Sequence, residues 1–523
     1  MPGSEPWPEA RRFPTAALAT PHYLATSAGL DILASGGNAV DAAVAAAVAL
    51  AVVAPYTSGP GGDCLALVWD GDGLVAYNGS GRAPAGATPD AVRAAAAADF
   101  LPVRGPLTLT VPGAVDAWFA LLERFGAKSF DQVAASARGY ASRGFPLTAQ
   151  GAGRIAAGAV AAAGQPGEWQ AVYGTAAAGE TLVQPGLART LEALCRDGPD
   201  VFYRGELGEA VAGFVQSAGG LLAVSDLDAH RGQWVSQVTS SYRGVDVAQL
   251  PPPSQGTTAQ FALNLVEAAA PVMPVGAVER LHLLIEASKL ALVERDRHLT
   301  DPDHMSVDPA ALADPARARE WLGELQPRAS HPPEGRPGPG GTAAVVVVDC
   351  DGRAVSLLGS NYMGFGSGLT VPGWGVNLHN RGAYFSLDPG HVNVIAPHKR
   401  TLHTLMPAMA LRHGRPWCVL GAMGGDGQAQ THVQLLSHLV DEGADVQLAV
   451  SAPRFRVEVD GWHLHLEGRF PPDIVDGLLQ RGHDARPAGR WDQRMGHAQA
   501  IVVDDRGLAG ATDPRAEGLV AGS

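Results

Sequence analysis

A run of proline and glycine, residues 328–341 (RASHPPEGRPGPGG), interrupts the chain and sets the first constraint on its fold. Because the run has too few apolar side chains to join a core, we expect it to be an exposed, mobile connection. Residues 342–348 (TAAVVVV) follow at once, and such a β-branched run is typical of a buried strand. We therefore expect two parts, residues 1–341 and residues 342–523, joined by a flexible segment.

The composition is that of a globular protein and excludes two classes of partner. Of 523 residues, 46% are hydrophobic and 17% are charged, which places the chain outside the disordered class. Lysine and arginine number 38 against 52 acidic residues, and the net charge of −14 argues against a broad nucleic-acid or anionic-membrane surface. The longest apolar run, residues 42–55, is too short to span a bilayer.

The N-terminal residues and the cysteines predict a cytoplasmic location. The first residues, MPGSEPWPEARRF, are polar and lack the apolar core of a secretory signal. The cysteines have no metal-ligand spacing and fit a reducing compartment better than a disulfide scaffold. They are Cys64, Cys195, Cys350 and Cys418.

The pattern of apolar residues predicts helices mainly in the first part and strands in the second. Residues 39–53 are almost all alanine and valine, so we expect a helix that is buried on all sides. Most of the chain between residues 107 and 330 should be helical, including residues 129–142, with a strand pair at about 235–250. The later strands enclose a helix over residues 429–442. This order favours sheets that lie between layers of helices.

Thr342 is the first candidate for a catalytic residue. The bond between Gly341 and Thr342 joins a glycine-rich segment to a core strand, and it suits self-cleavage because glycine tolerates strained conformations. Cleavage would give Thr342 a free α-amine with a reference pKa of about 8. That amine can act as the base for the hydroxyl of the same residue. The alternative is a threonine that merely begins a strand, and the local sequence alone favours it.

Two glycine-rich loops are candidates for a binding or catalytic role. In MGGDGQ (residues 423–428), the amides of Gly424 and Gly425 can face a developing oxyanion or a phosphate. A tight turn explains the same residues, and nucleotide binding is the weakest interpretation because no Walker lysine or dinucleotide fingerprint is present. SNYMGFGSG (residues 360–368) follows a strand and either positions hydroxyls beside a site or is an ordinary connection.

Histidines raise a metal hypothesis that their spacing does not support. Neither the group His379, His398 and His403 nor the pair His463 and His465 forms a helical i,i+4 pair with a carboxylate or a tight ligand cluster. We therefore expect neither a metal nor another cofactor.

In their order along the chain, these motifs resemble the gamma-glutamyltranspeptidase family of N-terminal-nucleophile (Ntn) hydrolases, over nearly the whole sequence. In the first part the resemblance is carried by GGNAVDAAVA (36–45), SGPGG (58–62), APAGAT (83–88), TVPGAVDAW (110–118), GGLLAVSDL (219–227), YRG (242–244) and PPPSQG (251–256). In the second it is carried by the Thr342 strand, FGSG (365–368), DPGHVNV (388–394), KR (399–400), MGG (423–425), APRF (452–455) and TDPR (512–515). It implies an α+β fold, a four-layer αββα sandwich built jointly by a large and a small subunit of one precursor.

The resemblance implies roles for five residues. Thr342 falls on the family's nucleophile, which becomes the N-terminus of the small subunit after self-cleavage. Gly424 and Gly425 fall on the glycines of the oxyanion hole, and Ser360 falls where the family has a threonine that assists the nucleophile. Ala343 replaces the second threonine of the family's usual pair, which weakens a supporting hydrogen bond and leaves the nucleophile in place.

The substrate pocket departs from the family pattern. Ser80 aligns with the arginine that grips a glutamyl α-carboxylate, although Arg82 is near enough in sequence to replace it. Tyr384 aligns with the acidic residue that pairs with the α-amino group, and Arg381 aligns with the neighbouring glutamine.

Three further departures concern the same pocket. His403 and Thr404 replace two serines that help to hold the α-carboxylate, and Asn361-Tyr362 replaces an asparagine-containing segment. Residues 385–399 are too few to contain the family's active-site lid. In these respects the chain resembles the lidless branch of the family, which is similar to oxamate amidohydrolase and to cephalosporin-acylase-like members.

These departures predict an amidohydrolase for a small, carboxylate-bearing amide. The pocket loses the acidic partner of an ammonium group and gains Arg381, which can hold a carboxylate through two bonds. We expect Thr342 to form an acyl-enzyme that water then resolves. The residues expected around the substrate are Arg381, Arg82, Tyr384, His403, Thr404, Tyr362 and Asn361.

Two alternatives stay open at this point. One is gamma-glutamyl hydrolysis or transfer with glutathione-type donors. The other is an unprocessed, non-catalytic binding protein, which the altered pocket and Ala343 suggest. The expected partners are a small amide and the two fragments of the precursor, with a homodimer left open and with neither nucleic acid nor membrane.

Overall fold

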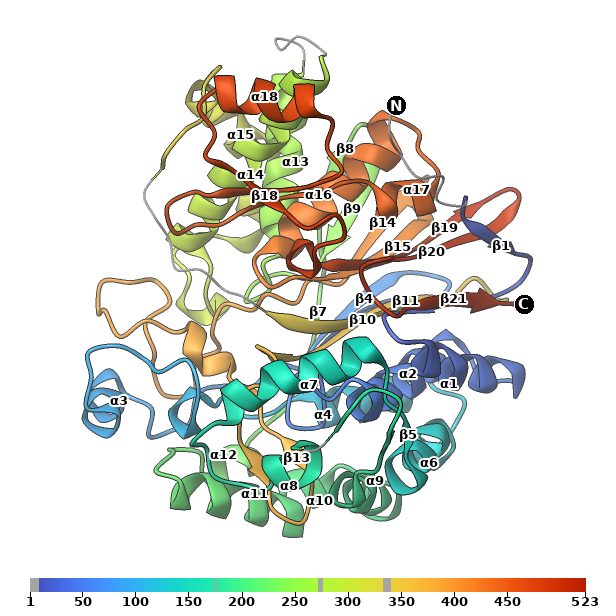
Figure 1. Ribbon diagram of the computed structural model, residues 1–523, viewed down its shortest axis with the longest axis vertical. Coiled ribbons are helices and arrows are strands. Elements are labelled where there is room, and N and C mark those ends of the chain that lie inside the picture. The colour runs from blue at the N-terminus through green and yellow to red at the C-terminus, as the bar shows by residue number, and fades with distance from the viewer. Residues whose placement is uncertain (1–8, 175, 271–275, 333–339) are drawn as a thin grey trace.

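The computed structural model describes residues 9–174, 176–270, 276–332 and 340–523. Two antiparallel sheets of seven strands each lie face to face at its centre (Figure 1). Sheet I has the order β1 (Arg11–Phe13), β20 (Gly507–Thr512), β19 (His497–Asp504), β15 (Arg415–Met423), β14 (Ala408–Arg412), β9 (Val245–Gln249) and β8 (Val238–Tyr242). Sheet II has the order β21 (Leu519–Gly522), β2 (Ala17–Thr20), β10 (Gly341–Val348), β11 (Ala354–Tyr362), β3 (Asp63–Trp69), β4 (Leu74–Asn78) and β7 (Gln233–Val235).

Helices cover the outer faces of both sheets and complete four layers (Figure 1). Sheet I is covered by α13 (Gly256–Ala269) and α16 (Gly427–Asp441), and α14 (Ala277–His298) packs against both helices, while sheet II is covered by α2 (Ala39–Val53) and α4 (Ala114–Phe125). Between the sheets lies a separate apolar cluster that includes Val346, Leu358 and Met409. The αββα sandwich implied by the sequence resemblance is therefore confirmed.

The remaining elements surround this sandwich. The helices are α1 (Tyr23–Ala34), α3 (Pro89–Ala96), α5 (Phe130–Val133), α6 (Ala135–Arg143), α7 (Ala149–Ala162), α8 (Trp169–Tyr173), α9 (Pro185–Asp197), α10 (Asp200–Tyr203), α11 (Glu206–Ser217), α12 (Val224–Asp228), α15 (Pro315–Glu320), α17 (Val446–Ser451) and α18 (Pro472–Gln480). The short strands are β5 (Phe145–Pro146), β6 (Thr181–Leu182), β12 (Thr370–Val371), β13 (Val376–Asn377), β16 (Phe455–Val457), β17 (Leu464–Glu467) and β18 (Ala485–Ala488). Among the described residues, no helix is both long enough and apolar enough to cross a membrane.

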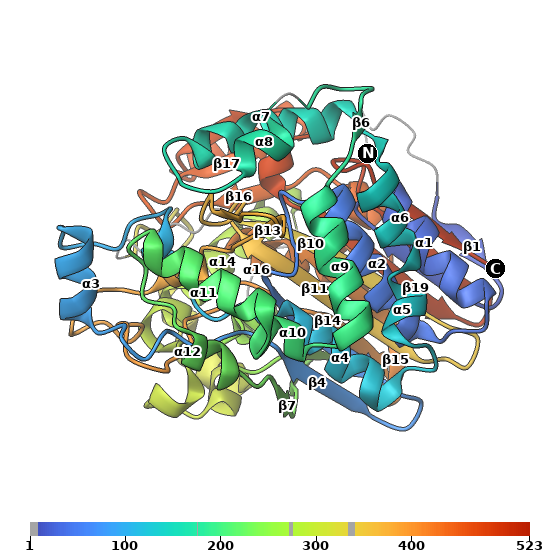
Figure 2. The ribbon, with the colours of Figure 1, turned by 90° about the horizontal axis from the view of Figure 1, so that it is seen from below.

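The predicted buried helix is confirmed as α2. All of its residues are buried, and it begins at a capping box in which Asn38 and Asp41 satisfy each other's backbone amides. The Asp41 carboxylate also accepts from the Ala127 and Lys128 amides, which explains how a charge is tolerated there. Figure 2, seen from below, shows α6 and α9 in front of α2, so that α2 is enclosed between them and sheet II.

One prediction about the elements is wrong in detail and another is confirmed. Residues 129–142 form two helices, α5 and α6, because a capping box at Ser129 and Gln132 closes a single turn and a turn at Ala134 separates it from the next helix. This break lets Phe130 stack on Phe119 at 4.4 Å between ring centroids. The predicted strand pair near 235–250 is confirmed as β8 and β9, which pair with each other in sheet I, and β7 just before them joins sheet II.

The boundary at residues 341 and 342 does not separate two domains. Both sheets combine strands from before and after this point, and Gly341 is the first residue of β10. The expected connection is also less free than its composition suggests over residues 328–332. There the Ala329 amide donates to Arg481 O (2.8 Å) and the Trp462 indole donates to Pro332 O (2.6 Å). The rest of the connection, residues 333–339, lies outside the described residues.

Candidate active site

Thr342 is the second residue of β10 and is 2% exposed. Gly341 pairs with Tyr362 and Ala343 pairs with Gly359, so β11 carries one extra residue opposite Thr342. This bulge brings Ser360 to the bond where cleavage is predicted. The Ser360 hydroxyl donates to Gly341 O at 2.6 Å, and the Tyr362 amide donates to Ser360 Oγ at 2.8 Å. The carbonyl of the Gly341–Thr342 bond is thereby polarised by a hydroxyl that the backbone itself orients.

The predicted oxyanion loop lies beside this bond. Gly424 and Gly425 follow β15 and precede α16, with φ values of +153° and +58° that favour glycine. A Cβ built on Gly340 would lie 2.8 Å from the Cα of Gly425, so the chain before Thr342 runs directly over the loop. The positive end of the α16 dipole points toward the same place, where negative charge is stabilised.

Gln255, which precedes the predicted cleavage point in the sequence, hydrogen-bonds to this loop. Its amide nitrogen donates to Gly425 O at 2.9 Å and to Thr404 O at 3.0 Å, while its oxygen accepts from Arg295 at 3.0 Å. Its motif, PPPSQG, contributes to the family resemblance, but only the fold reveals that Gln255 holds a loop 170 residues away.

Gln428 contacts the candidate nucleophile and was not singled out by its sequence. It is fully buried in the first turn of α16, with its side-chain amide 3.2 Å from Thr342 Oγ. The amide also faces two backbone carbonyls, Ala422 O at 3.1 Å and Thr404 O at 2.9 Å. Because carbonyls only accept, the amide nitrogen must face them, and the amide oxygen then accepts from the Thr342 hydroxyl.

Arg381 is a buried cation with unused hydrogen-bonding capacity. It is 1% exposed and burial lowers its pKa, yet neither its Nε nor its Nη2 has a hydrogen-bond partner among the described residues. Its Nη1 donates to Thr404 Oγ at 3.2 Å, and its guanidinium lies 4.2 Å from the centre of the Tyr362 ring. Thr404 and Tyr362 in turn contact Gln428 and Gly341, so Arg381 lies at the same site as Thr342.

A buried carboxylate, Asp63, holds Arg381 and His403 in place. Asp63 Oδ2 accepts from His403 Nε2 at 3.0 Å and lies 3.9 Å from Arg381 Nε. Burial alone would raise the pKa of Asp63, but His379, His403 and Arg381 together hold it well below its ordinary value. Burial lowers the pKa of His403 to about 4, so the imidazole is neutral near pH 7. Its Nδ1 accepts from the Leu405 amide, which leaves the proton on Nε2, toward Asp63.

The pocket contains a carboxylate, that of Asp426, although the sequence predicts that it has lost one. The Tyr384 hydroxyl donates to Asp426 Oδ1 at 2.6 Å, and Asp426 follows directly after Gly424 and Gly425, the predicted oxyanion glycines. Arg295, whose side chain is fully buried, also donates to Asp426 Oδ1 at 2.6 Å. The sequence alone does not pair Asp426 with Tyr384, because the two residues lie in different parts of the chain. Burial raises the pKa of the Tyr384 hydroxyl.

Two other predicted pocket residues are engaged at the edges of the site. Arg82 donates from Nη1 to Asp301 Oδ2 (3.0 Å) and to His398 O (2.8 Å), and it is also near Asp303. Asn361 donates to Pro55 O at 3.3 Å and faces the glycine-rich loop of residues 59–62. In the described structure, neither residue hydrogen-bonds to Thr342 or Arg381.

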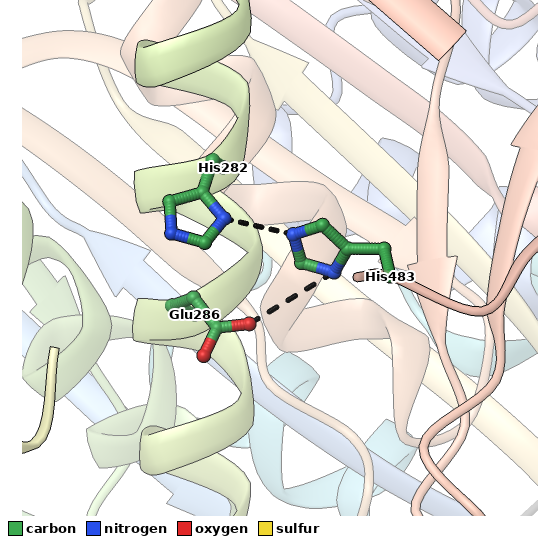
Figure 3. A group of neighbouring side chains, drawn as sticks. All are labelled: His282, Glu286 and His483. Atoms are coloured by element: carbon green, nitrogen blue, oxygen red, sulfur yellow. Dashed lines mark hydrogen bonds and ion pairs between the residues drawn. The ribbon is translucent and has the colours of Figure 1, made fainter. Parts of the chain in front are cut away.

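His282, Glu286 and His483 form one cluster with metal-ligating side chains elsewhere in the molecule (Figure 3). Their ligand atoms lie within 4.8 Å of one another, and His282 and Glu286 are one turn apart on α14. However, the Lys289 ammonium lies 2.9 Å from Glu286 Oε1 and the Ser330 amide donates to Oε2 at 2.9 Å. Since an ammonium already meets the carboxylate, the cluster fits an anchor for the chain near Ser330 better than a metal centre.

Comparisons with known proteins show which family the chain resembles. The sequence model of the family described as Gamma-glutamyltranspeptidase matches residues 25–523. The chain is 39% identical to the glutathione hydrolase-like YwrD proenzyme of Bacillus subtilis over 97% of this chain and 98% of that protein. It is 38% identical to the oxamate amidohydrolase proenzyme of Klebsiella pneumoniae, over 96% and 97% of the two chains.

A solved structure extends the similarity to the whole fold. The cephalosporin acylase from Bacillus halodurans superimposes with a TM-score of 0.93 and 37% identity, over 100% of this chain and 99% of that one. The family and these relatives are Ntn hydrolases that act as amidohydrolases or transpeptidases. Full-length agreement in sequence and fold thus supports what the order of motifs implied, and this chain belongs to the gamma-glutamyltranspeptidase family.

Proposed function

We propose that this chain is a proenzyme that cuts itself between Gly341 and Thr342 and then hydrolyses a small amide whose acyl group carries a carboxylate. The observation that carries the choice of substrate is Arg381, a buried guanidinium with two nitrogens that lack partners in the described structure. A planar carboxylate can accept from both nitrogens at once. The relative that acts on oxamate, a small amide with an adjacent carboxylate, is consistent with this class.

In self-cleavage, the Thr342 hydroxyl attacks the carbonyl carbon of Gly341. The Ser360 hydroxyl already donates to the oxygen of that carbonyl and can follow the charge that develops on it. The proton that Thr342 Oγ loses on attack passes to the nitrogen of Thr342, and the C–N bond then breaks, which leaves an ester between Gly341 and Thr342 Oγ. Water hydrolyses this ester to a Gly341 carboxylate, residues 1–341, and a free α-amine on residues 342–523.

In amide hydrolysis, the α-amine takes the proton of the Thr342 hydroxyl as the oxygen attacks the substrate carbonyl. The amides of Gly424 and Gly425 stabilise the tetrahedral oxyanion, and the α-ammonium returns the proton to the leaving amine. Water then attacks the acyl-enzyme, releases the acid and regenerates Thr342. Arg381 holds the carboxylate of the acyl group, and the Tyr362 ring beneath its guanidinium keeps that plane fixed.

The first experiment is the intact mass of the purified wild-type chain beside Thr342→Ala. Two fragments, the smaller starting at Thr342, are expected for the wild type, and a single chain is expected for Thr342→Ala. A single uncut wild-type chain that equals the control would contradict the proposal and favour the non-catalytic binding protein.

One observation favours a second candidate, gamma-glutamyl hydrolysis. Asp426 places a carboxylate beside Tyr384, where an α-ammonium group could be met, and one relative is glutathione hydrolase-like. Glutaryl-p-nitroanilide and gamma-glutamyl-p-nitroanilide differ only by this ammonium group and therefore isolate it. We expect the glutaryl compound to have the higher kcat/KM because the buried Arg295 already meets Asp426. A clear preference for the gamma-glutamyl compound would instead support the second candidate.

A further inference from the structure

We propose that Gln428 is a positioning residue that holds the hydroxyl of Thr342 both for self-cleavage and for amide hydrolysis. The inference rests on the proposed function, because it takes Thr342 to be the nucleophile. It adds a residue for which the order of motifs gave no role.

The first step of the argument is that the Gln428 amide has a single orientation. It is fully buried, so water cannot satisfy a misplaced amide. Two carbonyls, Ala422 O at the end of β15 and Thr404 O, lie 3.1 and 2.9 Å from the amide nitrogen in that orientation. Turning the amide by 180° would place its oxygen against both carbonyls and leave three acceptors together.

The second step is that this orientation fixes the direction of the Thr342 hydroxyl. The amide oxygen lies 3.2 Å from Thr342 Oγ and can only accept, so the hydroxyl donates to it. Before the reaction, the single proton of the threonine hydroxyl is directed to Gln428 and the lone pairs of Oγ are available for attack; as the new C–O bond forms, this proton passes to the nitrogen of Thr342. An amide is not basic at neutral pH, so Gln428 orients the hydroxyl and takes no proton from it.

The third step is that Gln428 links the nucleophile to the two other parts of the site. Thr404 receives the Gln428 amide on its carbonyl and Arg381 Nη1 on its hydroxyl. The Gln428 backbone amide donates to Gly425 O, which anchors the oxyanion loop at 3.1 Å. Gln428, at the start of α16, therefore fixes the nucleophile relative to the oxyanion loop through its backbone and relative to the arginine through its side chain.

The experiment compares Gln428→Leu and Gln428→Glu with the wild type. Gln428→Leu removes the acceptor, so self-cleavage and kcat should each fall about 10-fold, the scale of one hydrogen bond, with KM changed less than about 2-fold. Gln430→Leu is the matched control, because Gln430 is buried on the same helix but its side chain hydrogen-bonds, among the described residues, only to the Val457 backbone. It should lose stability without a comparable loss of kcat in the cleaved protein.

Gln428→Glu gives a readout that a purely structural role would not produce. Burial and the two carbonyls should raise the pKa of the introduced carboxyl group. When protonated, the carboxyl group donates to a carbonyl and accepts from Thr342 as the glutamine does. The rate of this variant relative to the wild type should therefore be highest at low pH and fall as pH rises. Taking the ratio at each pH removes the shared dependence on the α-amine.

The outcomes separate this inference from the proposed function. If the wild type cleaves and hydrolyses amides while Gln428→Leu does both at wild-type rates, the positioning role is refuted and the proposed function stands. If Gln430→Leu loses as much kcat as Gln428→Leu, and the ratio for Gln428→Glu is flat with pH, the role of Gln428 is structural only. If the wild type itself stays uncut and inactive, the proposed function fails first.

Discussion

Replacing Arg381 by methionine tests the substrate class most directly. Methionine keeps the length and the apolar stem of the side chain while removing every N–H donor. In the structure, the Nε and Nη2 of Arg381 lack partners among the described residues, whereas Nη1 is already bonded to Thr404. The substitution therefore removes one internal hydrogen bond and two that are open to a substrate carboxylate.

The expected loss follows from these two open positions. A hydrogen bond between charged partners contributes about 1.5–3 kcal/mol, and each 1.4 kcal/mol is about tenfold in kcat/KM. We expect kcat/KM for a carboxylate-bearing amide to fall by about 10- to 100-fold. The estimate is smaller than two full bonds would give because Asp63, 3.9 Å from Arg381 Nε, already offsets part of the charge.

The assay measures the release of ammonia from oxamate and from oxamide, in which an amide replaces the carboxylate. If Arg381 binds the carboxylate, the substitution lowers kcat/KM on oxamate much more than on oxamide. Arg381→Lys serves as the second variant, because it keeps a cation beside Asp63 but loses the two-pronged geometry. Equal losses on both substrates, with a lower melting temperature, would refute carboxylate binding and make Arg381 a structural partner of Asp63.

Three further predictions concern cleavage and pH. Ser360→Ala should slow self-cleavage about 10-fold, measured on gels over time, because the carbonyl of Gly341 loses its hydroxyl donor, and an unchanged rate would contradict this role. Gly340→Val should also slow cleavage, since its side chain would meet Gly425 at less than van der Waals distance, but kcat of the cleaved fraction should be normal. His403→Gln should flatten the pH dependence of the free energy of unfolding. The histidine, with its pKa lowered to about 4, stabilises the fold above about pH 6.5 and loses that contribution as pH falls, by at most about 1.4 kcal/mol per pH unit. Urea unfolding at about pH 5 and pH 7 measures this, and an unchanged slope would contradict it.

The parts of the site that the sequence predicts are those that follow one another along the chain. Thr342 comes directly after the proline and glycine run, and Gly424 and Gly425 lie between a strand and a helix. Each motif is ambiguous alone, and the order of many motifs favours a catalytic role for these residues. The buried helix α2 could be predicted for a simpler reason, since its stretch of alanine and valine offers hardly any polar face to water.

The parts that could not be predicted depend on contacts between elements distant in the sequence. Gln255 and Gln428 are ordinary polar residues in sequence, and they become meaningful only where α13 and α16 bring both to Thr404 O. Likewise, nothing in the sequence pairs Asp63 with His403, which lie 340 residues apart. In the sequence, Tyr384 stands where the family has an acidic residue, so the pocket is expected to lack that carboxylate. The fold instead brings the Asp426 carboxylate beside Tyr384.

The directions of the open hydrogen-bond donors in the pocket, more than its net charge, should select the substrate. Asp63 already lies near Arg381 and Asp426 already meets Arg295, so both carboxylates are countered before any substrate binds. Asp63 accepts from His403 and from the Gly81 amide, which accounts for one bond on each of its oxygens.

Arg381 differs because two of its nitrogens have no partner among the described residues, and such buried donors are costly to leave unmet. A ligand gains most by supplying two coplanar acceptors, which a carboxylate does and a single carbonyl does not. A neutral group of the same shape with one acceptor, such as the amide of oxamide, would leave one donor unmet. The pocket should therefore discriminate between oxamate and oxamide more sharply than its nearly balanced charge suggests.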